Sequence, residues 1–177
     1  MTQRMFEIIR WAFMKLNNGR GIKSRGIPKL KRGVEIKSKG SSIYLGKSFN
    51  AQTNTHFVAV NGGDLMIGDH VSFNRNCIVI CRGAITIGDR CTFGPNVCIY
   101  DHNHKFDLEG VKGLLKAGEI VIGKSYWISA GVIILKDTHI GDGCVIGAGA
   151  VVKGVIPEHS VVTSDRTLKI TPIKERP

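Results

Sequence analysis

Two histidines separated by one residue are the side chains of this sequence best suited to chemistry at neutral pH. His102 and His104 lie in the stretch YDHNHKFD, between Asp101 and Asp107. An imidazole titrates near pH ~6.5, so its neutral form can accept the proton of a hydroxyl group. A metal site needs more ligands than this pair supplies, and a structural role for both rings is the third interpretation. The pattern favours a general base, which would activate a hydroxyl group.

A repeat of six residues surrounds these histidines. Helical amphipathicity would recur at three and four residues, and a half-buried strand alternates with a period of two. Steps of six from Ile122 instead meet only β-branched residues: Ile122, Ile128, Ile134, Ile140, Ile146 and Val152. The same step runs through three upstream triplets, which are Leu45-Ala51-Phe57, Ile67-Phe73-Val79 and Ile87-Phe93-Ile99. Three units predict one triangular coil of short strands, stacked on its neighbours by parallel pairing.

The longest break in the repeat contains the histidines. The step from Ile99 to Ile122 is 23 residues long, where six would continue the coil. A long insertion on a rigid solenoid is a common place for function. We therefore predict that residues 100–119 form the active-site loop.

The repeats resemble the hexapeptide-repeat acyltransferase family. The resemblance rests on IGDRCTFGPNVCI and on VIGKSYWISAGVIILKDTHIGDGCVIGAGAVV, and it covers about residues 43–162. It implies an all-β fold, the left-handed parallel β-helix, which is an exception to the right-handed crossover rule. It also implies a homotrimer that holds acetyl-CoA and the acceptor in clefts between subunits.

The loop is similar to that of galactoside- and maltose-type and of streptogramin (virginiamycin-type) O-acetyltransferases. In those enzymes a loop histidine deprotonates an acceptor hydroxyl, which attacks the thioester of acetyl-CoA in a ternary complex. Counting from the GPNV segment, residues 94–97, places the galactoside-type histidine at His104. The streptogramin-type pattern Asn-His-Arg-x-Asp matches residues 103–107 and also selects His104. His104 is therefore the predicted base, and His102 is the second candidate.

The same resemblance assigns residues to acetyl-CoA. Trp127 belongs to a segment that lies beside the active site in the family, although its outward phase also suits subunit packing. Ser129 replaces the family's glycine in that segment. The backbone of Ala130 and Ala148 would contact the pantetheine arm. The basic side chains expected to bind the phosphates are Lys153, Arg166 and Lys169.

Four residues are assigned to the acceptor. Asn74 matches an asparagine that lines the acceptor site of galactoside-type members. Arg82 stands where those members have an acidic residue, so an anionic acceptor would suit it. Tyr100 and Asp101 begin the loop and complete the set. We predict a sugar hydroxyl acceptor, on a cell-surface polysaccharide or its precursor.

Residues 1–42 are predicted to form a basic helix and cap. Apolar residues at helical spacing predict an amphipathic helix over residues 3–16, which Asn17-Asn18-Gly19 ends. Residues 1–47 carry a net charge of +10, from 12 basic and two acidic side chains. This helix either covers the open first coil or binds an anionic lipid surface, and the two roles are compatible. Residues 163–177 are expected to be a basic C-terminal tail.

Composition argues against membrane-spanning, secreted and nucleic-acid-binding proteins. With 42% hydrophobic residues the chain can build a core, and no apolar run reaches the ~18 residues of a membrane span. No signal-peptide core is recognised, so we expect a cytoplasmic protein, peripheral to the inner face of the membrane if the helix binds lipid. No base-reading module accompanies the basic segment, so nucleic acid is not expected as a partner.

The cysteines point away from metal chemistry. The chain has five cysteines and no CxxC pair, so neither zinc nor a disulfide framework is expected.

Two alternatives to a sugar O-acetyltransferase stay open. One is an antibiotic O-acetyltransferase of the streptogramin type. The other is a non-acetyltransferase β-helix, such as a γ-carbonic-anhydrase-like metalloprotein with histidines from neighbouring coils.

Overall fold

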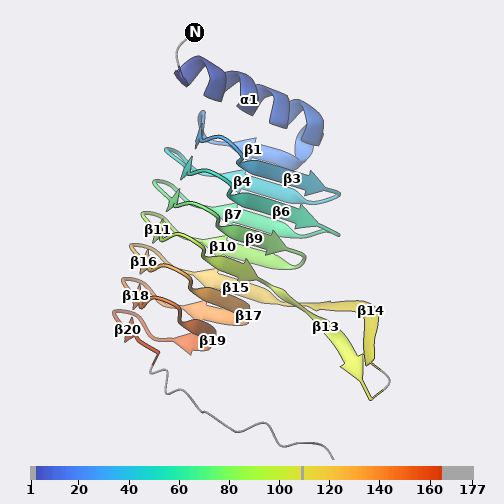
Figure 1. The fold of residues 1–177 in the computed structure, drawn as a ribbon, viewed down its shortest axis with the longest axis vertical. Coiled ribbons are helices and arrows are strands. Elements are labelled where there is room, and N and C mark those ends of the chain that lie inside the picture. The colour runs from blue at the N-terminus through green and yellow to red at the C-terminus, as the bar shows by residue number, and fades with distance from the viewer. Residues whose placement is uncertain (1–2, 109, 165–177) are drawn as a thin grey trace, which may run out of the picture.

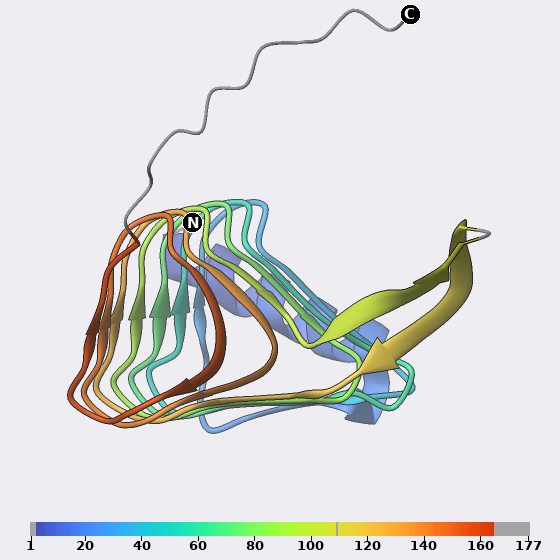
Figure 2. The same ribbon diagram turned by 90° about the horizontal axis from the view of Figure 1, so that it is seen from below.

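The computed structural model describes residues 3–108 and 110–164, which form a parallel β-solenoid of about six coils capped by one α-helix. Figure 1 shows the coils stacked along the long axis, with α1 (Gln3–Asn18) across the N-terminal end. Seen along the stack, the coils have a triangular outline (Figure 2). The predicted all-β coil of hexapeptide repeats is therefore confirmed.

Each coil contributes one strand to each of three faces. The first face contains β1 (Ile22–Ser24), β4 (Ser42–Leu45), β7 (Asp64–Ile67), β10 (Ala84–Ile87), β15 (Glu119–Ile122) and the end of β17 (Ile133–Ile140). The second contains β2 (Lys29–Leu30), β5 (Asn50–Ala51), β8 (Ser72–Phe73), β11 (Thr92–Phe93), β16 (Trp127–Ile128), β18 (Val145–Ile146) and β20 (Val161–Val162). The third contains β3 (Glu35–Lys39), β6 (His56–Val60), β9 (Ile78–Cys81), β12 (Cys98–Tyr100), the start of β17, and β19 (Val151–Ile156). All pairings within these faces are parallel, and residues at equivalent repeat positions stand side by side.

The repeat positions point inward and form the core. Every residue of the series that begins at Ile122 is buried, as are the members of the three upstream triplets. Phe73 illustrates the packing, because its ring stacks on Phe93 with centroids 4.0 Å apart and meets Phe57 edge-on at 5.0 Å. Each coil thus covers the apolar side of the next one, which is why the period of six persists along the chain.

The corners between faces need special backbone conformations. Asn54, Asn76 and Asn96 recur at one corner with φ between 57° and 60°, a left-handed conformation that asparagine tolerates better than most residues. Close stacking sets a second requirement. A Cβ on Gly88 would lie 2.2 Å from the carbonyl oxygen of Gly123 in the next coil, so only glycine fits without a shift.

The first coil begins earlier than the sequence analysis predicts. Residues 22–39, assigned there to a cap, form β1, β2 and β3, which pair with the second coil in parallel register. The predicted helix over residues 3–16 is present as α1, followed by a 3-10 turn at Gly19–Gly21. Trp11 is its buried residue, at 5% exposure. The helix therefore covers the open end of the stack, as one of its two predicted roles requires.

Candidate active site

An antiparallel hairpin replaces one corner of the solenoid. β13 (His102–Asp107) and β14 (Gly110–Ala117) project from the stack between β12 and β15 (Figures 1 and 2). His102 pairs with Ala117 and His104 with Leu115, after which the register shifts. The base is closed where the backbone N–H of Gly118 donates to the carbonyl oxygen of Asp101 at 2.7 Å. The predicted active-site loop therefore coincides with an ordered β-hairpin.

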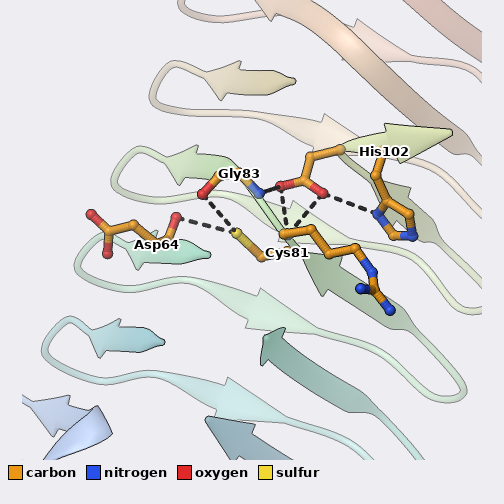
Figure 3. A network of polar contacts seen from close by, with 6 residues as sticks. Asp64, Cys81, Gly83 and His102 are labelled. Atoms are coloured by element: carbon orange, nitrogen blue, oxygen red, sulfur yellow. Dashed lines mark hydrogen bonds and ion pairs between the residues drawn. The ribbon is translucent and has the colours of Figure 1, made fainter. Parts of the chain in front are cut away.

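A buried carboxylate lies at the base of this hairpin. Asp101 has no exposed surface, and its carboxylate accepts the backbone N–H groups of Arg82 at 2.9 Å and Gly83 at 2.8 Å, both from the preceding coil. The same carboxylate lies 3.1 Å from Nδ1 of His102 (Figure 3). Because a carboxylate only accepts hydrogen bonds, this contact favours the neutral tautomer that carries its hydrogen on Nδ1, in which Nε2 has the lone pair.

The residues around this carboxylate limit the available chemistry. The Cys81 thiol is buried and contacts the carbonyl oxygen of Asp64 at 3.3 Å. Burial, and then the charge of Asp101, raise the pKa of Cys81 far above its ordinary value. A protonated thiol is a poor nucleophile. Cys81 therefore fits a packing role, and the oriented imidazole is the reactive group of this cluster.

Two further predicted acceptor residues adjoin this pair, Tyr100 at His102 and Arg82 at Asp101. Tyr100 places its ring edge-on to the imidazole, with centroids 6.4 Å apart, and burial raises the pKa of its hydroxyl to about 12. Arg82 is partly buried, and within the described residues its Nε is a buried atom without a hydrogen-bond partner. Tyr100, Asp101, Arg82 and His102 therefore form one cluster, which the sequence analysis predicted only as separate assignments.

His104 lies outside that cluster, in an open hollow of about 470 Å³ at the side of the hairpin. The hollow is lined by residues of both hairpin strands and of β17, namely Asn103, His104, Lys105, Phe106, Lys112, Lys116 and Lys136. His104 is exposed, whereas Lys136 is 7% exposed and pairs with the carboxylate of Asp137. The hollow therefore places an accessible imidazole among lysines.

Lys136 and Lys116 are site candidates that the sequence analysis missed. Lys136 could have been found from the sequence, because it lies two residues from Ile134 and two from Thr138, on the inward side of the same strand. The pKa of the Asp137 carboxyl is lowered, first by its hydrogen bond from Lys136 and then by the charges of Lys116 and Lys153. Positive charge therefore dominates this corner.

Most predicted acetyl-CoA residues lie at a different corner. Trp127 stands on β16, on the second face, and is 59% exposed. Ser129 and Ala130 follow it at the corner where Asn74 follows β8, and the exposed Ala148 comes after β18 at the same corner. Within one chain these residues do not meet the hairpin, which leaves from the corner after the third face.

Three predicted cofactor residues remain: Lys153, which the structure describes, and Arg166 and Lys169 of the C-terminal tail. Lys153 is exposed on β19, and its charge helps to lower the pKa of Asp137. It therefore lies at the corner from which the hairpin leaves. Arg166 and Lys169 lie outside the described residues. Within residues 3–108 and 110–164, no three metal-ligating side chains come together, and no helix is long and apolar enough to cross a membrane.

Comparisons with known proteins agree with this architecture. A family model described as bacterial transferase hexapeptide (six repeats) matches residues 119–154. The chain is 30% identical over 137 residues to "Putative lipopolysaccharide biosynthesis O-acetyl transferase WbbJ" of Escherichia coli K12, covering 72% of this chain and 69% of that protein. Over several curated relatives the chain spans 47% to 69% of the relative's own length.

Two solved structures share the fold. A maltose O-acetyltransferase from Clostridium difficile 630 superposes with a TM-score of 0.55 at 25% identity, covering 97% of this chain and 88% of that one. A hexapeptide-repeat acetyltransferase from Vibrio cholerae, complexed with acetyl coenzyme A, superposes with a TM-score of 0.57 at 19% identity, covering 90% and 83%.

Proposed function

The chain belongs to the bacterial hexapeptide-repeat transferase family, and on that premise we propose that it transfers an acetyl group from acetyl-CoA to a sugar hydroxyl. The relatives support this proposal, since one is described as a lipopolysaccharide O-acetyltransferase, another acts as a maltose O-acetyltransferase, and a third binds acetyl-CoA. The proposed acceptor is a cell-surface polysaccharide or its precursor.

The contact between Asp101 and His102 carries the mechanistic part of the proposal. A buried carboxylate 3.1 Å from Nδ1 holds the ring and its tautomer, so Nε2 is ready to accept a proton. In the proposed reaction Nε2 takes the proton of the acceptor hydroxyl while the oxygen attacks the thioester carbonyl. The carbon–sulfur bond then breaks, and the imidazolium returns the proton to the departing thiolate. The products are the acetyl ester and free CoA.

His104 is the second candidate for this role, because the family's loop motif selects it and its ring is exposed in the hollow. Among the described residues no carboxylate forms an ion pair with its ring nitrogens, in contrast to His56, His102 and His139. A base that is not oriented loses part of its advantage in positioning. The geometry therefore favours His102 as the base, with His104 two residues further along the same strand.

Acetyl-CoA would bind along the corner formed by Ser129, Ala130 and Ala148, with the exposed Trp127 as a wall. Because these residues and the hairpin occupy different corners of one chain, we propose that the site is completed by a second copy of the chain. A homotrimer satisfies this requirement, since each hairpin then meets the donor corner of its neighbour.

The test measures acetyl transfer from acetyl-CoA by the purified full chain to glucose, galactose, maltose, glucuronic acid and a streptogramin. Transfer to a sugar supports the proposal, and transfer confined to the streptogramin replaces the acceptor class. His102→Ala should lower kcat by about 10²–10⁴-fold and leave CoA affinity unchanged in calorimetry, with His104→Ala as the matched variant. No transfer to any acceptor, together with stoichiometric zinc, would favour the metalloprotein alternative.

A further inference from the structure

The hollow beside His104 is strongly basic. Lys105, Lys112, Lys116 and Lys136 line it together with His104, Asn103 and Phe106. Asp137 is the acidic residue placed beside these lysines, and it is paired with Lys136. The side chain of Asp107, at the far end of β13, lies outside the described residues. Lys105 and Lys116 therefore add positive charge to the hollow beyond the pair of Lys136 and Asp137.

The burial of Lys136 distinguishes this hollow from an ordinary group of surface lysines. Lysines usually stay exposed unless they are paired, because taking an ammonium group out of water is costly. Lys136 is nevertheless 7% exposed, in the same alternation as the core residues of β17, and its ammonium group reaches the hollow that the hairpin forms above it. Its pairing with Asp137 neutralises one charge, and Lys105 and Lys116 add theirs from the two hairpin strands.

We infer that this hollow binds an anionic group of the acceptor, a carboxylate or a phosphate, so that the substrate is an acidic sugar. The inference rests on the proposed acetyl transfer and names its acceptor class. Residues two apart on a strand face the same side, so an anion held at His104 leaves the rest of the sugar near His102. The hollow's volume of about 470 Å³ is sufficient for a monosaccharide unit with its anionic substituent.

The phosphates of CoA are the competing occupant, and the test separates them. Binding of glucuronic acid, glucose 1-phosphate and glucose would be measured by calorimetry on the full chain, alongside Lys105→Gln and Lys116→Gln variants. Lys47→Gln is the matched control, because Lys47 is exposed at a solenoid corner outside the hollow. We expect the acidic sugars to bind at least tenfold more tightly than glucose, and each hollow variant to remove most of that difference.

The outcomes distinguish this inference from the proposed function. If acidic sugars bind and the hollow variants lose them while no acetyl transfer occurs, the anion site stands and the transferase proposal fails. If the variants raise KM for acetyl-CoA and leave acceptor KM unchanged, the hollow serves the donor and the inference is wrong. Equal binding of glucose and glucuronic acid to the wild type would also overturn it.

A second, independent observation concerns α1, whose apolar side faces outward. The side that packs on the first coil buries Trp11 and part of Met14. Polar contacts flank them, since Arg10 donates to the carbonyl oxygen of Lys31 at 2.8 Å and Asn18 donates to that of Ile36 at 3.1 Å. The large exposed apolar side chains on the other side are Met5, Phe6, Ile8, Ile9, Phe13 and Leu16, at 39% to 79% exposure. Such a contiguous apolar surface on a protein marks an interaction site.

The charge of the neighbouring coil indicates what binds to this apolar surface of α1. The first coil beneath α1 carries seven basic side chains, which are Lys23, Arg25, Lys29, Lys31, Arg32, Lys37 and Lys39. Three of them pair with carboxylates: Lys37 with Glu35 at 2.6 Å, Lys31 with Glu7 of α1 at 3.3 Å, and Arg25 with Asp69 at 3.2 Å. The coil therefore keeps an excess of positive charge. An exposed apolar helix face with basic side chains behind it is the composition of helices that lie on anionic lipid. We propose that α1 docks the protein on an anionic membrane surface.

Vesicle sedimentation tests this proposal with the full chain. We expect binding to vesicles of phosphatidylglycerol and phosphatidylcholine, and at least tenfold weaker binding to phosphatidylcholine alone. Substituting Phe6, Ile9 and Phe13 together by serine should abolish binding. Val155→Ser, at an apolar residue of β19 that is even more exposed, should not. Absence of binding by the wild type refutes the proposal. If the triple variant still binds vesicles but has a different oligomeric state, the apolar surface of α1 forms contacts between copies of the chain, and the proposal is wrong.

Discussion

Replacing Asp101 by asparagine separates the two candidate bases. The carboxylate accepts the backbone N–H groups of Arg82 and Gly83 and faces Nδ1 of His102. An asparagine keeps the shape but has one acceptor oxygen and one donor group. Its oxygen is needed opposite the two backbone N–H groups, so its NH₂ group turns toward Nδ1. The imidazole hydrogen then moves to Nε2, and the ring can no longer accept the acceptor's proton.

The magnitudes follow from these contacts. Hydrogen bonds to a charged group contribute about 1.5–3 kcal/mol and neutral ones about 0.5–1.5 kcal/mol. Losing the charge on three contacts should therefore lower the free energy of unfolding by about 3–4.5 kcal/mol. The loss of a correctly protonated base should lower kcat by about 10²–10⁴-fold. Acetyl-CoA affinity should stay unchanged, because Asp101 has no exposed surface and cannot touch the donor itself.

The assay is steady-state transfer to the best sugar acceptor, with denaturant unfolding of the same variants. Asp101→Asn, His102→Ala and the double variant form a cycle. Since Asp101 is expected to act through His102, the double variant should be no slower than His102→Ala. A folded Asp101→Asn protein with kcat within threefold of wild type would refute the tautomer argument, and His104 would then be the base.

Further predictions concern the solenoid and its thiols. Phe73→Ala should lower the free energy of unfolding by about 3–5 kcal/mol, because its ring is buried between two other phenylalanines; urea unfolding measures this. Gly88→Ala should cost about 1–3 kcal/mol, since its Cβ would lie 2.2 Å from a backbone oxygen, whereas Gly113→Ala meets nothing within 4 Å and should be near neutral. At pH 8 a thiol reagent should label the partly exposed Cys98 first. Burial raises the pKa of Cys77 to about 11, so that thiol stays protonated, and rapid labelling found by peptide mass spectrometry would contradict the packing.

The sequence predicted the coil because each repeat position is decided locally. An apolar residue every sixth position is enough to place a side chain inside a triangular coil, and Ile67, Ile87 and Ile122 stand in register across their strands. The first coil was missed because Ser24 occupies the position that Leu45 and Ile67 fill in the next two coils. One polar residue in that position hid a repeat that backbone pairing completes.

The site was predicted less completely because its contacts join distant residues. The loop and both histidines could be identified from the break in the repeat. The orientation of His102 depends on backbone N–H groups 18 and 19 residues earlier, which meet Asp101 only when two coils stack. The burial of Lys136 likewise depends on a hairpin folding over it. Such contacts follow from the stacking of coils and cannot be read from spacing within one of them.

The insertion point explains how a hairpin can be added without disturbing the stack. Ala84 pairs with Glu119 and Ile87 with Ile122, so the coil resumes in register after the hairpin. The tip of the hairpin contributes little to the core, since Phe106 and Val111 are 79% and 71% exposed. Substitutions near the tip should therefore change acceptor binding more than stability. Asp101 is the exception, because its carbonyl oxygen closes the base of the hairpin while its carboxylate orients the imidazole. At that residue stability and catalysis depend on the same contacts, so a change there should affect both.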